Sequence, residues 1–163
     1  MNKKIVFVCT GNTCRSPMAE ALFKDILKER DGLGAEFSVF SAGIYAYEGD
    51  PAAYEAIDAM KEEFGIDISS HRARVLDDQD IREAYIILVM TRHHREMILE
   101  LYPEAADKVY TLKEYAGEEG GDPDICDPFG GDYEVYKGCS SEIEAMLLNA
   151  ADRLESDLQL RDA

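Results

Sequence analysis

The run from Tyr85 to Met90 is apolar at every position and constrains the fold more than any other stretch of the chain. A strand without polar positions must be covered on both faces, as a central strand is in a parallel sheet flanked by helices. Further strands are expected at 3–8, 37–42 and 109–112. Because helical patterns alternate with these strands, the sequence predicts an α/β fold: a three-layer sandwich in which helices flank a four-stranded parallel sheet.

The predicted helices carry apolar residues at intervals of three or four positions. We expect them at 17–30, 50–64 and 91–101, with one long helix starting near residue 132. In the second helix, Asp50 is expected to be the N-cap and Pro51 to occupy the first turn. A chain of 163 residues suits one domain over 1–163, and the acidic stretch 117–134 is expected to form a loop.

Charge and cysteine content narrow the classes of partner and cofactor. The net charge of −17 argues against nucleic acid and anionic membranes, because both select basic surfaces. The short apolar run Ile5–Val8 is too small for a signal peptide or a membrane span, so we expect a cytoplasmic protein. The four cysteines include no C-x2-C pair. We therefore expect neither a zinc site nor any other cofactor.

The strongest functional pattern follows the first strand, where five residues separate Cys9 from Arg15 and Ser16 comes next. Such a loop is short enough to curl around one tetrahedral anion, with backbone N–H groups pointing inward and a helix N-terminus behind it. Gly11 and Asn12 can adopt the positive φ that a tight loop needs. The same amides and Arg15 favour the thiolate form of Cys9, which is the nucleophilic form. The pattern predicts a loop that binds a phosphoryl group and attacks it.

The segment Val8-Cys9-Thr10-Gly11-Asn12-Thr13-Cys14-Arg15-Ser16-Pro17 resembles the signature of the low-molecular-weight protein tyrosine phosphatase family. The resemblance spans nearly the whole chain and includes Ser41-Ala42-Gly43 and the Asp127-Pro128 pair. It implies three catalytic residues, Cys9, Arg15 and Asp127. It also implies substrate contacts from Thr10, Gly11, Asn12, Thr13, Cys14, Ser16 and Phe129.

Each catalytic residue has a distinct task in this chemistry. Cys9 attacks phosphorus, and the planar fork of Arg15 holds two equatorial oxygens. Asp127 first protonates the leaving group and then activates the water that hydrolyses the phosphocysteine. By resemblance, Ser16 donates to the Cys9 sulfur and Asn12 holds the loop in place. The expected partners are phosphorylated proteins and phosphate-like oxyanions.

Other positions make the chain resemble the bacterial protein-arginine phosphatase branch of the family. These are Thr13, Phe129, the stretch Thr111–Tyr115, and Thr91, where tyrosine phosphatases usually carry an acidic residue. The resemblance implies hydrolysis of phosphoarginine in proteins. The first alternative is a phosphotyrosine phosphatase with the same catalytic residues. Arsenate reductase is a weaker alternative, because Cys126 and Cys139 look isolated from each other, and a noncatalytic phosphate-binding module would not need a thiol.

Two remaining groups of residues have more than one interpretation. Cys14 is close enough in sequence to form a disulfide with Cys9 under oxidation, and it can equally be a buried packing thiol. His93 and His94 follow the third strand, but no third ligand accompanies them. We therefore expect them to be polar caps or surface residues and assign them no metal.

Overall fold

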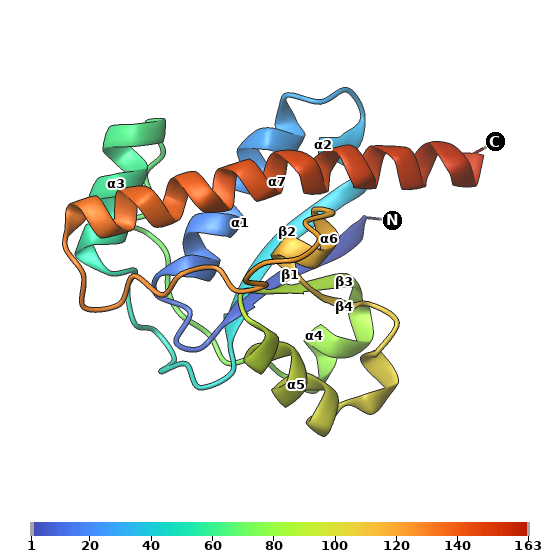
Figure 1. Cartoon of the computed structure of the whole chain (residues 1–163), viewed down its shortest axis with the longest axis horizontal. Coiled ribbons are helices and arrows are strands. Elements are labelled where there is room, and N and C mark those ends of the chain that lie inside the picture. The colour runs from blue at the N-terminus through green and yellow to red at the C-terminus, as the bar shows by residue number, and fades with distance from the viewer. Residues whose placement is uncertain (1, 163) are drawn as a thin grey trace.

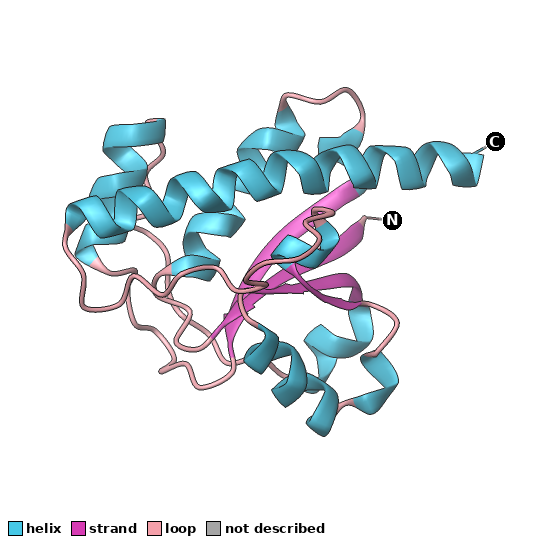
Figure 2. Ribbon diagram, in the orientation of Figure 1, coloured by secondary structure: helices cyan, strands magenta, loops and turns pink. Residues whose placement is uncertain are grey.

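The computed structural model describes residues 2–162, with the side chains as far as residue 159, and its four strands form one parallel sheet (Figures 1 and 2). The strand order is β2-β1-β3-β4, which confirms the predicted fold class. The strands are β1 (Lys3–Cys9), β2 (Phe37–Gly43), β3 (Ala84–Val89) and β4 (Val109–Thr111). All pairs are parallel, so the carboxyl ends of the strands lie at one edge.

Helices cover both faces of the sheet and complete the three layers (Figure 1). One face carries α1 (Arg15–Lys28), α3 (Tyr54–Phe64) and the long α7 (Tyr133–Asp162), and the other carries α4 (Asp78–Glu83) and α5 (Arg92–Leu101). The shorter elements are α2 (Leu33–Glu36), a 3₁₀ turn (Pro103–Ala105) and α6 (Leu112–Tyr115). No helix within 2–162 is both long and apolar enough to cross a membrane.

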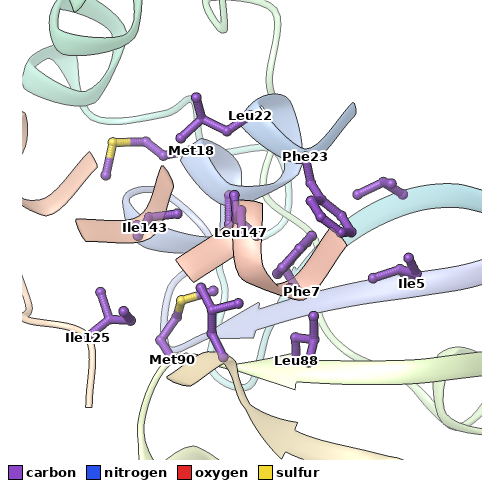
Figure 3. Packing of buried hydrophobic residues seen from close by; sticks show 14 of the residues in the cluster. Ile5, Phe7, Met18, Leu22, Phe23, Leu88, Met90, Ile125, Ile143 and Leu147 are labelled. Carbon is purple, nitrogen blue, oxygen red and sulfur yellow. The ribbon is translucent and has the colours of Figure 1, made fainter. Parts of the chain in front are cut away.

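Alternation along β1 divides the core into two clusters. Ile5, Phe7 and Cys9 face α1 and α7, whereas Val6 and Val8 belong to the cluster on the α4 and α5 side. Figure 3 shows Ile143 and Leu147 of α7 among Met18, Leu22 and Phe23 of α1, above Phe7. Cys9 therefore lies at the end of a strand whose two faces are both covered, and the scaffold beneath the loop is rigid.

The predicted start of the second helix is wrong. The helix α3 begins at Tyr54, and Ala53 occupies the N-cap position without a side-chain cap. Asp50 and Pro51 are extended because their backbone pairs with another segment: Pro51 forms an antiparallel bridge with Arg72, and the Asp50 carbonyl accepts from Ala73 N–H at 2.7 Å. Tertiary hydrogen bonds have overridden the local helix-start signal.

The short helices α2, α4 and α6 were not predicted. Two of them begin with a capping box, Asp77 with Asp80 before α4 and Thr111 with Glu114 before α6. Both signatures are visible in the sequence, but helices of six and four residues are too short to show an apolar period. The α1 helix also begins two residues earlier than expected, at Arg15.

We predict that Gly43→Ala disrupts the loop after β1. A Cβ at Gly43 would lie 2.6 Å from the Thr10 carbonyl oxygen and 3.0 Å from the Asn12 nitrogen, both of them backbone atoms. The expected loss is roughly 1–3 kcal/mol in unfolding free energy, together with weaker binding of inorganic phosphate. Urea denaturation and calorimetry measure the two effects. Gly138→Ala in α7 is the control, since its Cβ would meet open space; equal behaviour of the two variants would contradict the prediction.

Candidate active site

The backbone of the loop after β1 is held open by hydrogen bonds from outside it. The carbonyls of Thr10 and Thr13 accept from the N–H groups of Tyr45 and Ala53, each at 2.9 Å. The Asn12 carbonyl accepts from Nε2 of His71 at 2.7 Å. A peptide carbonyl and the next N–H point in opposite directions. Three outward carbonyls therefore turn the following N–H groups toward the inside of the loop, as an anion site requires.

Asn12 is the residue that gives the loop its shape. It is fully buried and has φ of +58°, which makes it the one non-glycine residue with positive φ in the described chain. Its Nδ2 donates to the hydroxyls of Ser16 (2.8 Å) and Ser41 (3.0 Å), and its Oδ1 accepts from Arg74 N–H at 3.0 Å. The positive φ expected at Asn12 is confirmed, whereas Gly11 does not adopt it.

Cys9 lies at the base of the loop, 3% exposed, with its Sγ 2.9 Å from Ser16 Oγ. Because the Ser16 oxygen already accepts from Asn12, its own proton is available to the sulfur. A hydrogen bond donated to sulfur stabilises a thiolate. The buried Asn12, Ser16 and Cys9 therefore form one connected polar chain.

Arg15 joins the loop to the acidic segment. It is 5% exposed, and its Nη1 donates to the Ile125 carbonyl at 3.1 Å. The Ile125 N–H donates to the Met90 carbonyl at 2.8 Å, which fixes this segment at the end of β3. These hydrogen bonds place Asp127, two residues after Ile125, next to the loop. Its Oδ2 lies 3.8 Å from Arg15 Nη2.

Asp127 lies in a locally rigid turn over the loop. Its Oδ1 accepts from Phe129 N–H at 3.1 Å, and Pro128 between them has a fixed φ. Phe129 N–H therefore orients one carboxylate oxygen and Arg15 the other, although 61% of the side chain is exposed. The carboxylate therefore lies at the mouth of the site, where it can meet a group that enters from solvent.

A cavity of about 440 Å³ opens above Cys9. It is lined by the predicted residues Cys9, Thr10, Gly11, Thr13, Cys14, Arg15, Asp127 and Phe129, and also by Tyr45, Tyr47 and Asp50. The two tyrosines are exposed at its mouth. Sequence reasoning missed these three residues, although their position in the loop after β2, at the carboxyl edge of the sheet, was a signal. Asn12 and Ser16 lie beneath the loop, so they support the cavity without lining it.

The expectation for His94 is wrong. His93 is exposed, but His94 is only 4% exposed and its Nε2 lies 2.9 Å from Thr10 Oγ1. Thr91 supplies the side-chain cap of α5. Burial, followed by the charge of Arg15, lowers the pKa of His94 to about 4. Among residues 2–162, no group of three His, Cys, Asp or Glu side chains is placed to hold a metal ion.

The other cysteines have defined partners. The buried Cys14 Sγ lies 3.2 Å from the Tyr136 hydroxyl, and burial raises the pKa of the Cys14 thiol. Cys126 and Cys139 were expected to be isolated, but the Cys139 thiol donates to the Cys126 carbonyl at 3.4 Å. The fold brings them together because Cys139 faces inward from α7 below the acidic segment.

Known proteins resemble the chain over almost its whole length. Residues 4–160 match the model of the low molecular weight phosphotyrosine protein phosphatase family. A protein-arginine-phosphatase of Geobacillus stearothermophilus is 43% identical, with 96% of this chain and 99% of that protein covered. The low molecular weight protein-tyrosine-phosphatase PtpB of Staphylococcus epidermidis is 37% identical, with coverage of 86% and 91%.

A solved structure of the YwlE arginine phosphatase is similar to this chain in fold and sequence. It is a cysteine-to-serine mutant with a phosphorylated active-site serine. The TM-score is 0.86 and the identity 40%, with 96% of this chain and 99% of that chain covered.

We predict an acid-dependent loss of stability caused by His94. The pKa is 6.5 when the chain is unfolded and about 4 when it is folded, so the unfolded state binds more protons between these values. Stability from the neutral ring is present above pH 6.5 and is lost as the pH falls toward 4. Between about pH 7 and pH 5 the expected loss is roughly 2 kcal/mol.

Urea denaturation at both pH values measures this effect. His94→Gln should have a shallower pH dependence than the wild type, because its amide does not titrate. His93→Gln, which changes the exposed neighbour, should keep the wild-type dependence. The same slope in His94→Gln and the wild type would show that His94 is not the group responsible.

Proposed function

Because the chain belongs to the low molecular weight phosphotyrosine protein phosphatase family, we propose that it hydrolyses phosphoarginine in proteins through a phosphocysteine intermediate. The observation that carries the proposal is the placement of the Cys9 thiol at the base of an anion loop, with Arg15 and Asp127 above it. We further propose that residues 1–163 act as one catalytic domain on phosphorylated proteins. A nucleophilic thiol requires a reducing compartment, which favours the cytoplasm.

In the first step, the Cys9 thiolate attacks phosphorus. The sulfur–phosphorus bond forms as the phosphorus–nitrogen bond breaks, and Asp127 gives its proton to the departing nitrogen. Inward N–H groups of the loop and the Arg15 guanidinium stabilise the equatorial oxygens. The support for this assignment is the shared cavity, in which Cys9 lies at the base and Asp127 at the mouth.

In the second step, water hydrolyses the phosphocysteine. Asp127, now a carboxylate, takes a proton from the water as its oxygen bonds to phosphorus and the sulfur–phosphorus bond breaks. The Ser16 hydroxyl, 2.9 Å from Cys9 Sγ, stabilises the thiolate that leaves. The products are inorganic phosphate and the regenerated Cys9 thiolate, with Asp127 protonated again. One carboxyl group therefore serves as acid and then as base.

Thr13 and Asp127 support phosphoarginine as the substrate. Thr13 is half-buried and lines the cavity, and its hydroxyl lies 3.7 Å from Cys14 Sγ, so a small polar side chain occupies this part of the wall. The exposed Asp127 carboxylate can pair with a guanidinium before it donates a proton to nitrogen. Phe129 supplies an apolar wall at the mouth.

A second candidate substrate is phosphotyrosine. The exposed rings of Tyr45, Tyr47 and Phe129 surround the mouth of the cavity and can pack against a flat aromatic leaving group. The similarity to a tyrosine phosphatase also favours this candidate. Arsenate reduction has less support, because the family and the relatives reported above are phosphatases.

We predict that Asp127→Asn slows substrates with poor leaving groups far more than activated ones. Only poor leaving groups need the proton, and the expected difference is roughly a hundredfold in kcat. A series of aryl phosphates with graded leaving-group pKa measures it. Cys9→Ser is the control: it should abolish turnover while inorganic phosphate still binds. Equal losses across the series would remove Asp127 from the role of general acid.

We predict that wild-type protein prefers phosphoarginine and that Thr13→Ile shifts the preference toward phosphotyrosine by roughly tenfold or more. Isoleucine removes both the hydroxyl and the space beside the phosphoryl group. The measurement is kcat/KM on matched phosphoarginine and phosphotyrosine peptides. Thr13→Val separates the loss of the hydroxyl from the loss of space. A wild-type preference for phosphotyrosine would instead establish the second candidate substrate.

A further inference from the structure

His94 and Thr10 form a contact that the catalytic steps above do not use. We infer that the Thr10 hydroxyl is an additional hydrogen-bond donor to the bound phosphoryl group, and that His94 is the positioning residue that orients this hydroxyl. The inference rests on the proposed function, since it concerns the same anion site. It gives a function to His94, which belongs to α5 on the side of the sheet opposite α1 and α7 (Figure 1).

Thr10 has two neighbours, the His94 ring and the cavity. Thr10 follows Cys9 directly and lines the cavity above it, while its Oγ1 lies 2.9 Å from Nε2 of the buried His94 ring. The backbone N–H of His94 donates to Thr91 Oγ1 at 3.1 Å, which fixes the first turn of α5. This backbone bond fixes the start of the helix from which the buried ring extends, and the Nε2 atom of the ring contacts the threonine hydroxyl.

The protonation state of the ring determines which group donates. Burial and the nearby charge of Arg15 lower the pKa of His94, so the ring is neutral near pH 7. Its Nδ1 is buried and has no hydrogen-bond partner within the described residues. A buried N–H without an acceptor is rare and costly. The single proton therefore resides on Nε2, and His94 donates to Thr10 Oγ1.

This direction leaves the hydroxyl proton of Thr10 free. The oxygen accepts from His94, and within residues 2–162 the hydroxyl makes no other hydrogen bond. A hydroxyl whose oxygen accepts from one donor directs its proton away from that donor, and Thr10 is one of the residues that line the cavity. The ionised oxygens of a phosphoryl group accept hydrogen bonds and donate none. The bound anion is thus the partner that completes this hydrogen bond, and the bond is charge-assisted.

The first experiment measures binding of inorganic phosphate by calorimetry, a readout that does not depend on turnover. Thr10→Val keeps the side-chain shape and removes the hydroxyl, and we expect it to weaken binding by about tenfold or more. Thr10→Ser should bind more tightly than Thr10→Val. The control is His93→Gln, which changes the exposed neighbour of His94. Wild-type affinity in Thr10→Val would overturn the inference.

The second experiment separates positioning from a structural role. His94→Leu should weaken phosphate binding as Thr10→Val does, whereas His94→Gln keeps an N–H donor and should recover most of the affinity. In the Thr10→Val background, His94→Leu should cause no further loss of affinity, because the hydroxyl that it orients is gone. Additive losses, or equal losses in His94→Leu and His94→Gln, would overturn the positioning role.

Turnover distinguishes this inference from the proposed function. If wild-type protein does not hydrolyse para-nitrophenyl phosphate but Thr10→Val still weakens phosphate binding, the proposed function fails and the Thr10 contact stands. If wild-type protein hydrolyses it and Thr10→Val matches the wild type in both binding and kcat/KM, the function stands and the inference fails.

Discussion

The buried amide of Asn12 is the interaction on which the rest of the site depends. The backbone of Asn12 is left-handed, and its side chain makes hydrogen bonds to two hydroxyls and one backbone N–H. Three segments of the chain therefore meet at this side chain. An unsatisfied amide at this depth would cost about 1–3 kcal/mol per lost partner. The network therefore makes the shape of the anion loop and the packing beneath it inseparable: the loop cannot open unless buried polar groups lose their partners.

Local sequence patterns were sufficient for the sheet and for the loop. The apolar run 85–90 and the Cys9-to-Arg15 spacing are local signals, and their interpretation needed no knowledge of distant residues. Positions determined by long-range hydrogen bonds were not predictable in this way. Asp50 carries a clear helix-start signal that pairing with residues 72 and 73 overrides. The sequence around His94 is typical of a surface histidine, because its hydrogen-bond partner Thr10 is 84 positions away in the chain.

At the carboxyl edge of the sheet, backbone carbonyls rather than side chains hold the acidic segment and Arg15 in place. The carbonyl of Met90 holds the N–H of Ile125, and the carbonyl of Ile125 holds the guanidinium of Arg15. Side-chain identity at position 125 is thus constrained only by packing, whereas the backbone path is fixed at both ends. This is why the long acidic loop, which has few apolar residues of its own, can deliver Asp127 to a defined place.

The contacts that α7 makes with the N-terminal part of the chain have a consequence for folding during synthesis on the ribosome. The helix packs along α1, and its Tyr136 touches Cys14 in the loop at the opposite end of the sequence. Contacts of such large sequence separation form late, because loop-closure entropy must be overcome first. A nascent chain in which β1 and α1 have emerged holds all the residues of the anion loop, yet it lacks Asp127 and the helix that covers the core. The site around Cys9 is therefore complete only after Asp127 and α7 have also been synthesised.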